Sequence, residues 1–123
     1  VYYVQYAHAR ISSILAKAHA AGLSPATDFS GVLEGDAVAT GLAREALRLP
    51  EVVEDGARSE ETHGVTAYLM ELATTFHAFY RDRRVVDTED PETSAGRLAL
   101  VELTRSTIRN ALDLLGISAP ESM

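Results

Sequence analysis

Residues suited to binding through flat rings and positive charge open the chain. Tyr2, Tyr3 and Tyr6 fall within two helical turns, and Arg10 lies four residues after Tyr6. Tyrosine combines a flat apolar ring with a polar tip, which suits stacking on a nucleic-acid base or filling a half-wet groove. Residues four apart share a helix face, so Tyr6 and Arg10 would act together. The alternative is that the tyrosines plug the end of a bundle helix, which periodicity alone favours because aromatic stripes are usually core.

Arginines cluster at two further places, which are candidate contacts for phosphate groups. The two clusters are Arg81, Arg83 and Arg84, then Arg97, Arg105 and Arg109. The first cluster could equally complement the dipole at the C-terminal end of a helix. The net charge of −7 argues against non-specific nucleic-acid binding, which needs a broad basic field. A local basic face remains compatible with this charge if the acids, concentrated at residues 51–61 and 87–92, point elsewhere.

The side chains needed for catalysis or metal binding are present, but not in a pattern that indicates either. There is no cysteine. The four histidines lack the i, i+4 pairing of a zinc-binding helix, since they are His8, His19, His63 and His77. No Gly-x-Ser-x-Gly motif frames a nucleophile, and no glycine-rich loop has the spacing to hold phosphates. His8 and His77 lie among apolar neighbours, which favours core histidines with satisfied hydrogen bonds. We therefore expect no catalytic and no metal site.

The spacing of apolar residues predicts an all-α fold, a helical bundle of about five helices in one domain. The predicted helices cover residues 1–18, 36–49, 50–57, 63–84 and 91–115. Asp36 and Asp90 are the expected N-caps, and Gly22 and Gly116 are the expected helix stops. The last helix has such a broad apolar arc that we expect it to be buried on more than one side.

The connecting segments and the ends of the chain carry weaker signals. Residues 22–35 form a connector long enough to hold a short helix, 59–62 a polar turn and 85–91 a second loop. The chain opens inside a helical pattern without a methionine, so we expect a piece of a longer protein. No apolar run reaches membrane-spanning length, no signal-peptide pattern opens the chain, and the lack of cysteine fits a reducing compartment. We expect a cytoplasmic location.

Four stretches together resemble one protein family in the order in which the family has them. They read YYVQYAHARI at residues 2–11, FHAFYRDRRV at 76–85, RLALV at 97–101 continuing to 116, and LLGISAPESM at 114–123. The family is the C-terminal, anticodon-binding (DALR-type) domain of arginyl-tRNA synthetase, and the resemblance covers essentially the whole chain. Ser122 stands where the family usually has arginine, and Ala111 where it has glycine. Some relatives carry a tryptophan near Arg84, and this chain has none.

The resemblance implies recognition of the anticodon stem-loop of an arginine tRNA. Anticodon contacts would come from Tyr6, Tyr80 and Met123, with further tRNA contacts from Arg10, Arg84 and Arg109. This requires the tail to fold back so that Met123 lies within reach of Tyr6. Family members charge arginine onto tRNA with ATP and magnesium in a preceding catalytic domain, whose signatures are absent here. The resemblance therefore implies that residues 1–123 alone bind no cofactor and catalyse no aminoacylation. It implies tRNA and that catalytic domain as partners. It implies no binding to DNA or to a membrane.

Two alternatives remain open. The chain could be a helical protein–protein interaction module that uses its acidic surface for a basic partner. It could also be the similar tRNA-binding helical domain of another synthetase. A scaffold of the first kind would be indifferent to RNA, which separates it from an anticodon-binding domain.

Overall fold

The protein is a helical bundle in which three layers of helices lie on one another. The computed structural model describes residues 1–59 and 63–123, and in this part it contains helices and no strand. The helices are α1 (Tyr2–Ala20), α2 (Ser30–Leu33), α3 (Ala37–Ala46), α4 (Leu49–Ser59), α5 (His63–Asp82) and α6 (Pro91–Leu114). Since α2 has only four residues, the other five helices of the described part build the bundle. The predicted all-α bundle is confirmed.

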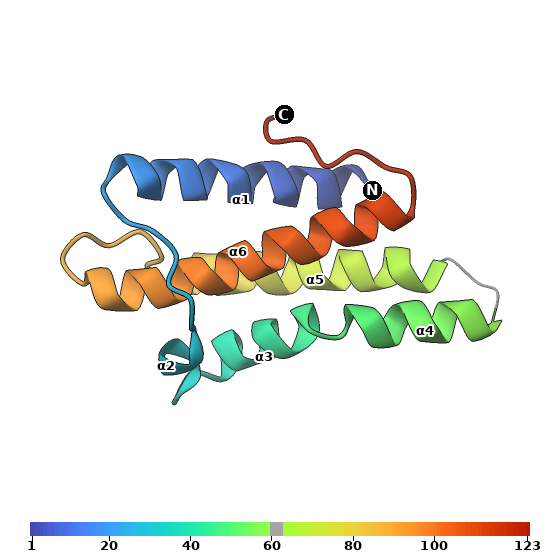
Figure 1. The fold of residues 1–123 in the computed structure, drawn as a ribbon, viewed down its shortest axis with the longest axis horizontal. Helices are drawn as coiled ribbons and strands as arrows, with labels where there is room; N and C mark the ends of the chain where they lie inside the picture. The colour runs from blue at the N-terminus through green and yellow to red at the C-terminus, as the bar shows by residue number, and fades with distance from the viewer. Residues whose placement is uncertain (60–62) are drawn as a thin grey trace.

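The layers place α1 on one side of α5 and α6, and α3 with α4 on the other side (Figure 1). Helix α6 packs against α1, α2, α3 and α5, which confirms that the last helix is buried on more than one side. The acid-rich helix α4 contacts α5 and lies far from α1 (Figure 1). The acids of α4 therefore do not face the tyrosines of α1.

The helix ends follow local signals in the sequence. The Asp36 carboxylate accepts hydrogen bonds from the backbone N–H groups of Val38 and Ala39 at 3.1 and 3.0 Å, and so caps α3. Asp90 caps α6 in the same way. Gly22 and Gly116 adopt positive φ angles of 82° and 70°, the left-handed conformation that ends a helix at little steric cost. All four predicted ends are confirmed.

Other boundaries differ from the prediction by a few residues. Helix α1 continues to Ala20, and α4 begins at Leu49 and runs to Ser59. Helix α5 ends at Asp82, so only Arg81 of the first arginine cluster lies in its last turn. Arg83 has left the helix, and its Nε and Nη2 donate to the two Asp36 carboxylate oxygens at 2.6 Å each. This ion pair is the tertiary contact that the helical pattern of α5 could not reveal. Residues 60–62 of the predicted polar turn lie outside the described residues.

The connector 22–35 is attached to the start of α6. The Ala26 N–H donates to the Ala95 carbonyl at 2.9 Å, and the predicted short helix is α2. A Cβ added to Gly96 would lie 2.6 Å from Cγ1 of Val32 on α2. Glycine at this position therefore allows α2 to approach α6 closely, which places the connector at the end of the bundle away from Tyr6.

Candidate nucleic-acid interface

Tyr6 and Arg10 lie on the exposed side of α1 and border two hollows, one on each side of the helix. The first hollow lies between α1, α6 and the C-terminal tail, and the second lies between α1 and α5. Their volumes are about 750 and about 760 Å³, within the range that small-molecule and base-sized ligands occupy. Tyr6 and Arg10 therefore lie on one face of α1, as their spacing predicted.

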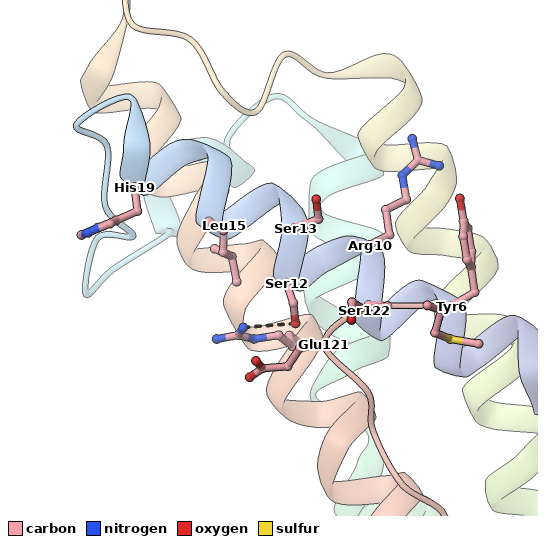
Figure 2. A pocket seen from close by; sticks show the side chains of 12 residues that line it. Tyr6, Arg10, Ser12, Ser13, Leu15, His19, Glu121 and Ser122 are labelled. Carbon is pink, nitrogen blue, oxygen red and sulfur yellow. Dashed lines mark hydrogen bonds between the residues drawn. The ribbon is translucent and has the colours of Figure 1, made fainter.

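The first hollow, called here the tail hollow, brings the last residue of the chain to the first helix. Met123 lines it together with Tyr6 and Arg10, and both Met123 and Tyr6 are exposed. Figure 2 shows Ser122 of the tail beside Tyr6 and Ser12 of α1. The predicted return of the tail to within reach of Tyr6 is confirmed.

Polar groups line part of the tail hollow, among them the Arg105 guanidinium of α6 and the Glu121 carboxylate of the tail. Arg105 lines the hollow, and its Nη1 donates to Ser12 Oγ at 3.3 Å, which is the dashed line in Figure 2. Its Nη2 lies 2.8 Å from Glu102, so the guanidinium is held in place by an ion pair on the same helix. The edge of a base entering this hollow would meet hydroxyl groups of α1, the ion-paired guanidinium of Arg105 and the carboxylate of Glu121.

The second hollow, called here the aromatic hollow, contains the predicted stacking residue. Tyr80 lines it, and Cζ of Arg10 lies 5.2 Å from the centroid of the Tyr80 ring. The Tyr80 ring is also stacked with Phe76 of the core, with centroids 6.0 Å apart and planes 14° apart. The ring is therefore held in orientation by the core and by a cation–π contact before any ligand binds.

His77 joins the aromatic hollow, although the sequence predicted a core histidine at this position. Its ring centroid lies 5.4 Å from that of Tyr3 and 6.4 Å from that of Tyr6, and the residue is only half-buried. Burial and, secondarily, the charge of Arg10 lower the pKa of His77. It is therefore neutral at pH 7 and contributes an aromatic face rather than a charge. Its spacing of three residues from Tyr80 on α5 is a signal that could have indicated this.

His8 is buried as predicted, but in the described part of the chain only one of its two ring nitrogens has a hydrogen-bond partner. Its side chain is fully buried, and Nδ1 lies 2.7 Å from the Pro120 carbonyl oxygen. A second α1 side chain reaches the tail, since Gln5 Nε2 donates to the Ser118 carbonyl at 3.0 Å. Sequence reasoning missed this role of Gln5 and His8, because the acceptors are backbone carbonyls that no residue type marks.

Two predicted tRNA contacts, Arg84 and Arg109, do not line either hollow. Arg84 is exposed beyond the end of α5, with Nε 4.0 Å from Asp87. Arg109 is exposed on α6, close enough to lower the pKa of His8 by its charge. The two arginine clusters meet at one point, where Arg97 Nη1 donates to the Arg84 carbonyl at 3.2 Å, while Arg81 lines the aromatic hollow and Arg105 the tail hollow. The tRNA-binding roles of Arg84 and Arg109 stay predictions.

No group of three or more potential metal-ligating side chains occurs among residues 1–59 and 63–123. Within these same ranges, no helix is both long enough and apolar enough to cross a membrane.

Comparison with known proteins gives one consistent family. The model of the DALR anticodon binding domain matches residues 4–123. Arginine–tRNA ligase 1 of Halalkalibacterium halodurans is 43% identical over 125 residues, which cover 100% of this chain and 22% of that protein. The arginine–tRNA ligase of Symbiobacterium thermophilum is 46% identical with the same coverage. The solved arginyl-tRNA synthetase of Thermus thermophilus superposes with a TM-score of 0.77 at 36% identity, over 98% of this chain and 21% of that one. The chain thus spans about a fifth of the length of these relatives.

Proposed function

Because this chain belongs to the DALR anticodon-binding domain family found in arginine–tRNA ligases, we propose that it binds the anticodon stem-loop of an arginine tRNA. Bases of a single-stranded RNA loop can be splayed out, stacked on aromatic rings or guanidinium planes, and read at their edges. The two hollows beside Tyr6 and Arg10 offer these contacts on one surface.

The observation that carries this proposal is the meeting of residues from three distant parts of the chain. Tyr6 and Arg10 come from α1, Tyr80 from the end of α5, and Met123 from the tail, yet they border adjoining hollows. Nothing in the packing of a helical bundle requires an exposed methionine and an exposed tyrosine to meet in this way. A surface that holds splayed bases does require neighbouring apolar and aromatic faces.

Each of these residues then has a distinct role. Tyr80 provides a stacking surface, and Arg10 supplies charge at its face. Tyr6 lies between the two hollows and contacts bases in both. The flexible, polarizable Met123 packs against a base in the tail hollow. Arg84 and Arg109 contact phosphates outside the hollows.

The same proposal assigns the chemistry to a part of the protein outside these residues. We expect the chain to serve as the C-terminal part of a cytoplasmic ligase that joins arginine to tRNA with ATP and magnesium. Because residues 1–123 contain no class I nucleotide-binding signature, they should not catalyse arginine-dependent ATP–pyrophosphate exchange. Exchange above a protein-free control would contradict this assignment.

A binding titration tests the proposed function directly. A fluorescent stem-loop with the anticodon loop of an arginine tRNA is titrated with the chain and followed by fluorescence anisotropy. The control RNA keeps the stem and replaces the anticodon bases. We expect the arginine stem-loop to bind about tenfold more tightly, because a wrong base typically loses 1–3 kcal/mol of stacking and edge contacts. Equal binding of both RNAs, or no binding, would overturn the proposal, and indifference to RNA would favour the protein–protein module.

A further inference from the structure

The tail after α6 runs back along α1 instead of leaving the bundle (Figure 1). Ile117 and Ala119 pack against the hydrophobic core. The alternate residues Ser118 and Pro120 present their carbonyl groups to α1, where they lie 3.0 Å from Gln5 Nε2 and 2.7 Å from His8 Nδ1. The tail is therefore held both by burial of alternate residues and by two hydrogen bonds.

The two α1 side chains match the tail in spacing. Gln5 and His8 are three residues apart, so they lie on one face of α1 with a rise of about 4.5 Å between them. The two acceptor residues are two positions apart in non-helical backbone. In extended backbone, residues two positions apart face the same way and are separated by about 6–7 Å. Long side chains bridge the small difference. One helix face thus presents two donors to two successive carbonyls of the tail.

His8 contributes to this contact as a neutral side chain. Because a carbonyl can only accept, Nδ1 carries the hydrogen and Nε2 is the bare nitrogen. Nε2 is buried without a hydrogen-bond partner in the part of the chain that the structure describes. Burial is the main cause that lowers the pKa of His8, and the charges of Arg109 and Arg105 on α6 act in the same direction. The Pro120 carbonyl and Glu121 of the tail act in the opposite direction.

We propose that Gln5 and His8 form a tail clamp, a pair of positioning residues that keeps Met123 beside Tyr6 before a ligand binds. A free tail would lose conformational entropy on ordering at the moment of binding, whereas a clamped tail has already lost it. The consequence for RNA affinity rests on the proposed function. The clamp itself is a property of the free chain and can be measured without RNA.

The first measurement uses the two methionines of the chain. Selective ¹³C-methyl labelling gives one NMR signal from Met123 and one from Met70, which lies on α5 and serves as an internal reference. His8→Leu and Gln5→Leu each remove a donor. We expect each to raise the population of free tail about fivefold, in line with the loss of one hydrogen bond, and to narrow the Met123 signal while the Met70 signal stays unchanged. An unchanged Met123 signal in the double variant would overturn the clamp.

Rescue by a conservative substitution separates the clamp from simple packing at a buried site. The Asn side chain places an N–H donor near the position of Nδ1, so His8→Asn should restore part of the ordered Met123 signal that His8→Leu loses. Equal loss in both variants would mean that the volume of His8 matters and not its hydrogen bond, which contradicts the proposal.

The second measurement links the clamp to RNA through a double-mutant cycle. His8→Leu should weaken binding of the arginine stem-loop about fivefold in the full chain and leave it unchanged in a chain that lacks residues 118–123. Equal weakening in both chains would show that His8 acts on the bundle and overturn its positioning role. If the unsubstituted chain does not prefer the arginine stem-loop, the proposed function fails, and the Met123 signal alone decides the clamp.

Discussion

Two junctions hold distant segments of this protein together, and they do so by different chemistry. At the scaffold junction, the Arg83 guanidinium makes a bidentate ion pair with Asp36, 47 residues away. At the tail junction, neutral side chains of α1 hold backbone carbonyls of the tail, and His8 and Pro120 are 112 positions apart in the sequence. The first junction joins the start of α3 to the end of α5, whereas the second joins α1 to a segment without helical structure.

This difference in chemistry determines which junction holds its segment more firmly. Charge-assisted bidentate hydrogen bonds are short and directional, and Asp36 also caps α3 with the same carboxylate. Two neutral hydrogen bonds hold a segment less strongly. The scaffold junction therefore fixes the layers more firmly than the tail junction fixes the tail.

The largest effect is expected at the binding surface, from Tyr80→Ala. Loss of one stacking surface should weaken binding of the arginine stem-loop by about 2 kcal/mol, or roughly thirtyfold in affinity. Tyr2→Ala is the matched control, because Tyr2 is an exposed tyrosine that lines neither hollow. Anisotropy titrations measure both variants, with circular dichroism to verify the fold. Equal losses of affinity in Tyr2→Ala and Tyr80→Ala would show that the aromatic hollow is not part of the binding site.

The next effect concerns the scaffold junction and should appear in stability. Asp36→Ala removes the cap of α3 and should lower the free energy of unfolding by about 1–2 kcal/mol, as measured by urea denaturation. The Met123 methyl signal should not change, because the tail is held elsewhere. Asp28→Ala is the control, since Asp28 is exposed and its carboxylate accepts hydrogen bonds from Ser30, two residues away. A mobile tail in Asp36→Ala would show that the two junctions are coupled.

A fall in pH should loosen the tail junction before the scaffold junction. The pKa of His8 in the folded chain lies below its ordinary value of 6.5, chiefly through burial. The folded state therefore binds fewer protons than the unfolded state just below pH 6.5, and the free energy of unfolding decreases as the pH falls through that window. Hydrogen bonding by Arg83 is the largest cause that lowers the pKa of Asp36, so the stability it contributes is lost only below its ordinary value of 3.8.

The measurement follows the Met123 signal from about pH 7.5 to about pH 5.5. We expect it to narrow progressively, since protonation adds an N–H at His8 Nε2, which has no hydrogen-bond partner in the described part of the chain. His8→Asn should abolish this pH dependence. His19→Gln should retain it, because His19, although it also lines the tail hollow, is exposed and lies about three helical turns from His8. A pH-independent tail in the unsubstituted chain would contradict the neutral state assigned to His8.

The smallest effect is expected from Arg84→Ala, outside both hollows. If Arg84 contacts a phosphate, its loss should reduce the slope of log affinity against log salt by about one unit. Affinity should fall by a similar factor for all RNAs tested. The control is Arg44→Ala, because Arg44 is exposed on α3, in the layer opposite α1. An unchanged slope would mean that Arg84 contacts only groups of the protein itself and no phosphate.

Much of the fold could be predicted from the sequence because its signals are local. Asp36, Asp90, Gly22 and Gly116 marked helix ends correctly, since a cap or a left-handed residue acts within about one turn. Apolar periodicity likewise located the long helices. The end of α5 was misplaced because Arg83 leaves the helix to reach Asp36, and no local pattern indicates that contact.

The candidate site divides in the same way. Residue types and spacing placed Tyr6 and Arg10 on one helix face, whereas the link from Tyr6 to Tyr80 and Met123 came from family resemblance and not from any spacing rule. The sequence by itself thus determined the helices, their ends and the aromatic start of α1, because these depend on neighbours within a few residues. Only the tertiary structure decided that α1 holds the tail, because the acceptors at Ser118 and Pro120 are backbone carbonyls, a group that every residue carries.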